Sequence, residues 1–341
     1  MRAFVRYVAG AWFAVSGLFA ACSVCLAATP IDRVQKIGVQ VNIDTFTASD
    51  AFRIKRTGFD FVRFGVWEHA LNKVEYRQEI TEAFAYARAV GLPVLVTVRS
   101  INALVPETAS GAQQEEMLQA AGFKLASIAG DLAHAFGHDL LAIELWNEPD
   151  VAAYWPTGNV TQTFQPYMRA VCAALQAQSL RVPVIGFAFS RPPDLGATAA
   201  TLSQQMAPLT NCLNGFSYHA YSMTQEQVKA SNVNIQSRYR LPALITEWGW
   251  SSDVANDPWQ QAQEVGNFLD WIRTTGTPVV SLYTWKDSTT GSLRERNFGL
   301  VTAQGAAKPA LNVVANALRY RYYRNPMMPI DNSRTKMAPR D

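Results

Sequence analysis

The sequence predicts an α/β fold, a single (β/α)8 (TIM) barrel, and three observations lead to this prediction. Eight β-rich runs follow one another from residue 37 onward, and segments with helical periodicity lie between them. Most of these runs are apolar throughout rather than alternating, as expected of parallel strands buried on both faces. They occupy about 290 residues, which matches the size of one such barrel.

The predicted elements alternate regularly along the chain. A helix at 77–90 illustrates the pattern, because Ile80, Phe84 and Ala87 share one face and Gly91 follows as a helix end. An open doubly wound sheet would need a glycine-rich phosphate turn after an early strand, and none is present. The predicted strands are 37–43, 59–67, 92–100, 140–148, 182–190, 215–221, 241–248 and 278–285. The predicted helices are 49–56, 77–90, 113–136, 162–178, a short one within 192–209, 225–238, 258–274 and 306–320.

The two ends of the chain are expected to lie outside the barrel domain, which spans residues 29–320. Residues 1–28 combine Arg2 and Arg6 with an apolar stretch and end in small residues, which indicates a secretory signal peptide. This predicts a periplasmic or secreted protein. A retained membrane anchor or a lipidated Cys22 is the alternative, and membrane contact is expected only in those cases. Residues 321–341 are predicted to be a C-terminal tail.

Composition limits the possible partners and the redox state. The chain is 49% hydrophobic and carries a formal charge of only +3, so neither a disordered protein nor a nucleic-acid binder is expected. We expect a monomer. Cys172 and Cys212 would remain after signal cleavage, and a disulfide and two buried free thiols are both compatible with the sequence.

Two glutamates carry the strongest functional signal. Glu148 lies in Leu-Trp-Asn-Glu-Pro and Glu247 in Ile-Thr-Glu-Trp-Gly, each at the end of a predicted strand. The carboxyl ends of barrel strands share one rim, so the two carboxylates are expected to face each other across the mouth. Such a pair suits cleavage of a glycosidic bond, in which one group protonates the leaving oxygen and the other attacks or activates water. A helix-capping role is the simpler alternative for Glu148.

These two motifs resemble the Asn-Glu-Pro and Thr-Glu-x-Gly signatures of the clan A retaining β-glycosidases, and the compact barrel is similar to families 39 and 5. The resemblance implies that Glu148 is the acid/base, that Glu247 is the nucleophile and that Asn147 binds the sugar 2-hydroxyl. Members with signal peptides include enzymes of bacterial exopolysaccharide clusters. The paired histidines that some cellulases carry after the third strand are absent from this sequence.

Further candidates come from other strand ends, where the clan has similar positions. Arg63 and Tyr221 are expected to keep Glu247 ionised, although Arg63 also suits a buried pair with Glu144. His219 is expected to orient Glu148 or Tyr221. Trp285 matches the aromatic platform under the reacting sugar, since a pyranose presents an apolar face. The rim residues Asn42, Asp44, Arg99 and Asn102 are plausible sugar contacts.

Other chemistries have no support in the sequence. The four histidines show no metal-ligand spacing, and no Gly-x-Ser-x-Gly elbow is present, so neither a metal nor a cofactor is expected. The prediction is an endo-acting retaining hydrolase of a bacterial exopolysaccharide or plant glycan. An exo-acting enzyme such as a β-xylosidase is the alternative within enzymes. A non-catalytic barrel that assists polysaccharide assembly is the alternative from another class, although it would have no use for paired glutamates.

Overall fold

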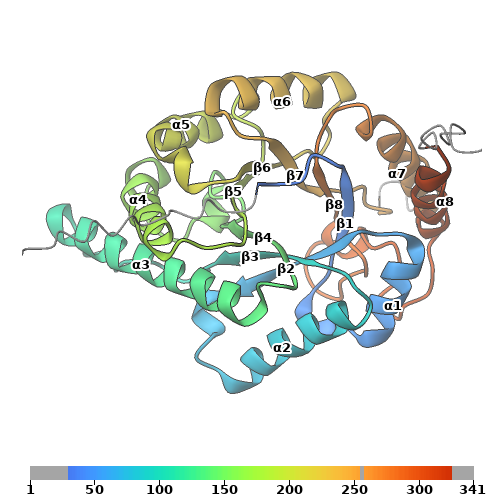
Figure 1. Cartoon of the computed structure of the whole chain (residues 1–341), viewed down its shortest axis with the longest axis horizontal. Helices are drawn as coiled ribbons and strands as arrows, with labels where there is room; N and C mark the ends of the chain where they lie inside the picture. The colour runs from blue at the N-terminus through green and yellow to red at the C-terminus, as the bar shows by residue number, and fades with distance from the viewer. Residues whose placement is uncertain (1–29, 254–256, 325–341) are drawn as a thin grey trace, which may run out of the picture.

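The structure is a computed structural model that describes residues 30–253 and 257–324, and these residues form a closed barrel of eight parallel strands (Figure 1). Each strand pairs with its neighbours in sequence, and the first pairs with the last. The predicted single (β/α)8 barrel is therefore confirmed. The strands are β1 (Lys36–Gln40), β2 (Phe61–Trp67), β3 (Val94–Arg99), β4 (Leu140–Leu145), β5 (Val184–Phe189), β6 (Gly215–His219), β7 (Ala243–Trp248) and β8 (Val279–Leu282).

Helices surround the barrel and return the chain to the amino-terminal side of the next strand (Figure 1). Several predicted strands end late, because their last residues belong to the loops of the barrel mouth. The main helices are α1 (Ala48–Thr57), α2 (Val74–Ala89), α3 (Gly111–Phe136), α4 (Val160–Gln178), α5 (Ala197–Met206), α6 (Gln225–Tyr239), α7 (Pro258–Ile272) and α8 (Pro309–Arg324). Short 3-10 turns are η1 (Ile43–Thr45), η2 (Glu68–Ala70), η3 (Ala152–Tyr154), η4 (Ala207–Cys212) and η6 (Glu295–Asn297).

The chain ends lie largely beyond the described part. The predicted signal peptide at 1–28 lies outside the described residues, as does most of the predicted tail at 321–341. Helix α8 continues to Arg324, past the expected domain boundary at residue 320. Within residues 30–253 and 257–324, none of the helices has the length and apolar character needed to cross a bilayer.

Local signals explain where several helices begin. The Thr47 side chain accepts from the backbone N–H of Asp50 while Asp50 accepts from that of Thr47, so the two form a capping box at α1. Thr224 and Gln227 form the same arrangement at α6. Such a cap stabilises a helix by about 1 kcal/mol. The carboxylate of Asp50 also accepts a hydrogen bond from the indole N–H of Trp285.

The apolar core divides into two clusters. The larger cluster lies between the strands and the helices. A small second cluster takes one residue from each of six strands, namely Phe61, Leu95, Ala142, Ile185, Leu244 and Val279. Gly38 on β1 is needed here, because a Cβ atom at this position would lie 2.4 Å from Cε2 of Phe61. The next position inward along β2 is Arg63 rather than an apolar residue, so the barrel interior changes from apolar to charged toward the mouth.

A disulfide resolves the question that the sequence left open. Cys172 of α4 bonds to Cys212 of η4 with a Cα–Cα distance of 5.3 Å, across 40 residues of sequence. Replacing both cysteines by alanine is expected to lower the free energy of unfolding by about 2–4 kcal/mol, since the bond restricts the unfolded chain. Urea unfolding of the oxidised wild type and of the double variant measures this. Equal midpoints for the two proteins would contradict the prediction.

Candidate active site

The two predicted glutamates meet at the mouth of the barrel. Glu247 lies on β7, and Glu148 follows the end of β4. One carboxylate oxygen of each glutamate and a ring nitrogen of His219 all lie within 4.8 Å of one another. Both glutamates are largely shielded from solvent, with side-chain exposures of 16% for Glu148 and 11% for Glu247. The sequence prediction that distant motifs converge here is therefore matched by the geometry.

The backbone after β4 aims Glu148 into the mouth. Trp146 and Glu148 both have left-handed backbones, with φ angles of 72° and 51°, which non-glycine residues rarely adopt. The turn is held from both sides, because the N–H of Trp146 donates to the Val98 carbonyl on β3 and that of Glu148 donates to the Ala188 carbonyl on β5. The neighbouring elements thus stabilise a strained turn at the functional group.

Trp146 anchors this turn from below. Its side chain is fully buried against Trp155 and Tyr167, and its indole N–H donates to the carbonyl of Tyr154 at 3.0 Å. The tryptophan beside Glu148 is therefore a packing residue. It fixes the backbone of the β4–α4 loop and has no exposed face for a sugar.

An irregularity in β7 sets the direction of Glu247. The strand pairing runs Tyr218 with Ile245 and then His219 with Glu247, so Thr246 has no partner residue on β6. One extra residue on a strand interrupts the alternation of side chains and changes where the next one points. This places Glu247 beside His219 at the rim.

Arg63 is the centre of the hydrogen-bond network. Its Nε and Nη2 atoms donate to Oε2 of Glu144 at 2.9 and 2.6 Å, while Nη1 donates to Oε1 of Glu247 at 2.5 Å. Nη1 also donates to Gln40 at 2.6 Å and Nη2 to Asn147 at 2.8 Å. The two alternatives for Arg63 therefore hold together, since it pairs with Glu144 and also contacts Glu247. Asn147 is fixed by the same guanidinium.

The surroundings of Glu247 favour its ionised form. Burial by itself raises the pKa of this carboxyl, but the positive charges of His219 and Arg63 and their contacts hold its pKa below the usual range. The phenol of Tyr221 adds a hydrogen bond to Oε2 at 3.0 Å. Burial and the nearby Glu247 raise the pKa of Tyr221 well above its usual value, so this phenol remains a donor.

His219 connects the two glutamates. Its Nδ1 lies 2.7 Å from Oε1 of Glu148 and 3.6 Å from Oε2 of Glu247, and its ring is fully buried. Burial lowers the pKa of His219, yet the adjacent Glu247 and Glu148 raise it above its usual value overall. His219 thus contacts Glu148, one of the two residues that it was expected to orient.

Replacing Tyr221 by phenylalanine tests this electrostatic arrangement. Without the phenol donor the pKa of Glu247 is expected to rise toward its usual range, so the acidic limb of the kcat/KM profile should move to higher pH. The loss of one hydrogen bond to a charged group is expected to lower kcat/KM about tenfold at the optimum. Tyr86→Phe is the matched control, because the Tyr86 phenol donates to the carboxylate of Glu82 on the exposed side of α2. An unmoved acidic limb in the Tyr221 variant would contradict the assignment.

Two predicted sugar contacts lie apart from this network. Trp285 is only 1% exposed, and its indole N–H donates to Oδ1 of Asp50 at 2.9 Å, while Lys286 holds the other oxygen of that carboxylate. Asn42 is exposed on the rim, where its side chain accepts from the N–H of Asp44. Neither has a described contact with the glutamates, and their roles in sugar binding stay predictions.

Other residues of the site were not proposed as such from the sequence. Gln40 pairs in register with Arg63, and Thr97 on β3 donates to Oε2 of Glu144 at 2.7 Å. Tyr283, two residues before Trp285, packs edge-on against Tyr221. Burial raises the pKa of Tyr283, and the charge of Glu247 adds to this effect. Its place directly after β8 is the only sequence signal for it.

Glu148, His219 and Glu247 also have the spacing of metal ligands. The buried guanidinium of Arg63 touches Glu247, and its positive charge disfavours a second cation at this place. The expectation that the site works without a metal stays a prediction.

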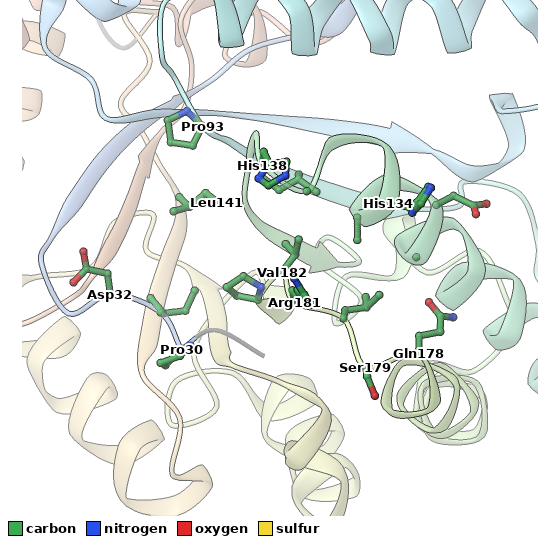
Figure 2. Close-up of a pocket in the computed structure, with 18 of the residues that line it drawn as sticks. Pro30, Asp32, Pro93, His134, His138, Leu141, Gln178, Ser179, Arg181 and Val182 are labelled. Atoms are coloured by element: carbon green, nitrogen blue, oxygen red, sulfur yellow. The ribbon is translucent and has the colours of Figure 1, made fainter. Parts of the chain in front are cut away.

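A large hollow lies at the opposite end of the barrel. It measures about 960 Å³ and is bordered by Pro93, His138, Arg181 and Val182 (Figure 2). These residues precede or begin strands β3, β4 and β5, so the hollow faces away from the glutamates. In a barrel of this kind the chemistry is found at the carboxyl ends of the strands. We therefore assign the active site to the mouth.

Comparison with known proteins gives one family match. A family model described as cellulase (glycosyl hydrolase family 5) matches residues 33–288. A search of curated proteins found no match.

Solved structures share the fold. The chain aligns with a family 39 glycoside hydrolase from Bacteroides cellulosilyticus WH2 at a TM-score of 0.67 and 18% identity, covering 85% of this chain and 65% of that one. It aligns with an exo-beta-1,4-mannosidase from Opitutaceae bacterium strain TAV5 at a TM-score of 0.60 and 14% identity, covering 85% of this chain and 60% of that one. It aligns with GH5_18 from Streptomyces cattleya in complex with GlcNAc at a TM-score of 0.61 and 15% identity, covering 86% of this chain and 82% of that one. The chain thus spans less than two thirds of the first two proteins, and these likenesses show the fold alone.

Proposed function

The chain belongs to glycosyl hydrolase family 5, and we propose that it cleaves β-linked polysaccharide with retention by double displacement. The single observation that carries the proposal is the close approach of two carboxylates, with one oxygen of each within 4.8 Å. Retaining glycosidases keep their carboxyl groups about 5–5.5 Å apart, whereas inverting enzymes need about 6.5–9.5 Å to admit a water molecule. The short spacing supports direct attack by a carboxylate.

Glu247 is the nucleophile in the first step. Its carboxylate attacks the anomeric carbon while the glycosidic C–O bond breaks, and Glu148 transfers a proton to the departing oxygen. The contacts from Arg63 and Tyr221 support this role, because a nucleophile must be ionised before it attacks. The product of this step is a covalent glycosyl ester on Glu247.

Glu148 changes role in the second step. It removes a proton from the incoming water, which attacks the anomeric carbon and releases Glu247 with net retention of configuration. The contact with His219 at 2.7 Å supports a precise orientation in both steps. Asn147 is held by Arg63 next to Glu148 and is proposed to bind the 2-hydroxyl of the reacting sugar.

The mode of cleavage, the substrate and the compartment are also part of the proposal. We propose endo-cleavage of a bacterial exopolysaccharide or plant glycan outside the cytoplasm by a monomeric protein. The Cys172–Cys212 disulfide supports an oxidising compartment. An exo-acting enzyme is the second candidate, since an exo-mannosidase is among the proteins of similar fold.

Product analysis tests the proposal. The mature protein is incubated with a panel of β-linked polysaccharides, and NMR follows the anomer and the length of the first products. Oligosaccharides released first as the β-anomer are expected. Release of the α-anomer would contradict retention, and release of monosaccharides alone would favour the exo-acting candidate. Binding without cleavage of every polysaccharide would instead indicate a non-catalytic barrel.

A further inference from the structure

A second arginine stands at the barrel mouth with surroundings unlike those of Arg63. Arg99 is the last residue of β3, and its guanidinium carbon lies 4.5 Å from the ring centre of Trp67 and 5.1 Å from that of Tyr154. All three side chains are partly exposed. Contact with two aromatic rings restricts the guanidinium while part of it remains accessible from the mouth.

This cation has no acidic partner in contact. Arg63 forms ion pairs with Glu144 and Glu247, whereas among residues 30–253 and 257–324 no ion pair includes Arg99. Its hydrogen bond to a protein acceptor is a long one of 3.5 Å, from Nη1 to the carbonyl of Asn147. Burial lowers the pKa of Arg99, and the charges of Glu247 and Glu148 oppose this effect without touching the guanidinium. A partly desolvated charge of this kind gains from an anionic partner.

The position of Arg99 would place such an anionic partner close to the proposed acid, Glu148. Asn147 precedes Glu148, so the guanidinium contacts the backbone that carries the proposed acid. Trp67 and Tyr154 offer aromatic surface beside the guanidinium, and such surface suits the apolar face of a pyranose. A sugar bound here would lie at the mouth, on the side formed by β2, β3 and the loop after β4.

We propose that Arg99 binds the carboxylate of a uronic acid residue in the substrate, so that the enzyme acts on an acidic polysaccharide. The inference rests on the proposed function and specifies its substrate class. A planar guanidinium matches a carboxylate with two parallel hydrogen bonds. Arg99 also counters the repulsion that an acidic sugar meets near Glu148 and Glu247. If Arg99 bound only the hydroxyls of neutral sugars, a charge on the sugar would bring no advantage.

Pairs of substrates that differ only in charge test this. Each pair consists of a neutral β-glucan, β-mannan or β-galactan and the same chain with part of its primary hydroxyls oxidised to carboxylates. Cleavage by wild type, Arg99→Gln and Arg99→Lys is followed as new reducing ends. Binding to Glu247→Gln, with and without Arg99→Gln, is measured by calorimetry. Arg88→Gln is the matched control, because Arg88 has a largely exposed side chain on the outer surface, where it pairs with Asp139.

We expect wild type to prefer the carboxylated member about ten- to one-hundredfold, and added salt to reduce this preference. Arg99→Gln should abolish the preference, because cleavage of the carboxylated member should fall about ten- to one-hundredfold further than cleavage of the neutral member. A urea unfolding curve that matches wild type would show that the variant folds. Arg99→Lys should keep part of the preference, because the charge remains without the planar fork. The Arg88 variant should behave as wild type.

Different failures have different meanings. Equal cleavage of both members by wild type, or an equal loss on both members in Arg99→Gln, would overturn the uronate site and leave the glycosidase standing. Absence of both binding and cleavage for every pair would count against the proposed function and therefore against this inference too.

Discussion

Replacing Glu247 by glutamine is expected to lower turnover about 10³-fold or more while leaving sugar binding nearly unchanged. The amide keeps the size of the side chain but provides no anionic oxygen to form the glycosyl ester. Arg63, which donates to Oε1 of Glu247, can hold the amide oxygen, and the amide NH2 then faces the hydroxyl of Tyr221, which can accept a hydrogen bond. The measurement is kcat on a cleaved oligosaccharide together with the Kd from calorimetry.

Glu148→Gln distinguishes the two roles. This variant should lose most activity on sugar leaving groups, which need a proton, but should still be glycosylated rapidly by an activated aryl glycoside. A burst of phenol release followed by slow turnover is expected for it and not for Glu247→Gln. Glu75→Gln, on the exposed first turn of α2, is the control and should match wild type. Near-normal turnover by Glu247→Gln would remove Glu247 from the nucleophile's role.

Arg63→Met is expected to lower the free energy of unfolding by about 3–5 kcal/mol, because it leaves buried carboxylates without their cation. Arg63 is 1% exposed, and Glu144 is fully buried beside it. Chemical denaturation followed by circular dichroism measures the loss. Activity should disappear as well, since Asn147 and Glu247 both lose a donor.

Two further variants make this prediction specific. Adding Glu144→Gln to Arg63→Met should restore part of the stability, because one unpaired buried charge is then removed. Arg88→Met removes the exposed partner of a long ion pair with Asp139, and it should change the free energy of unfolding by no more than about 0.5–1 kcal/mol. Equal losses in Arg63→Met and Arg88→Met would show that the buried network contributes no more than a surface pair.

The fold could be predicted from the sequence because each parallel strand is buried on both faces and forms an apolar run. The helices between them carry local capping signals such as Thr47 with Asp50. The two glutamates were found for a related reason, since each lies at the end of such a run, with a tryptophan within two residues of it. These are local features, and local features survive in a single sequence.

Features that depend on how the strands pair in the closed barrel could not be predicted from the sequence. Gln40 and Thr97 join the network only because neighbouring strands place Gln40 level with Arg63 and Thr97 level with Glu144. The orientation of Glu247 depends on an unpaired Thr246, which no residue pattern announces. The hydrogen bond from the Trp285 indole N–H to Asp50 joins residues 235 apart in sequence, and no local pattern announces it.

The contact between Arg63 and Glu144 has a consequence for the charge of the site during turnover. In the proposed mechanism, Glu247 loses its negative charge when it becomes an ester and regains it when water cleaves the ester. Glu144 lies deeper, with its Oε2 bonded by Arg63 and Thr97, and takes no part in bond formation. It therefore acts as a constant counter-ion, so that the guanidinium is neutralised in the covalent intermediate as well as in the resting enzyme. In the proposed mechanism, Glu144 thus keeps Arg63 paired with a carboxylate while the negative charge of Glu247 disappears and returns once in every catalytic cycle.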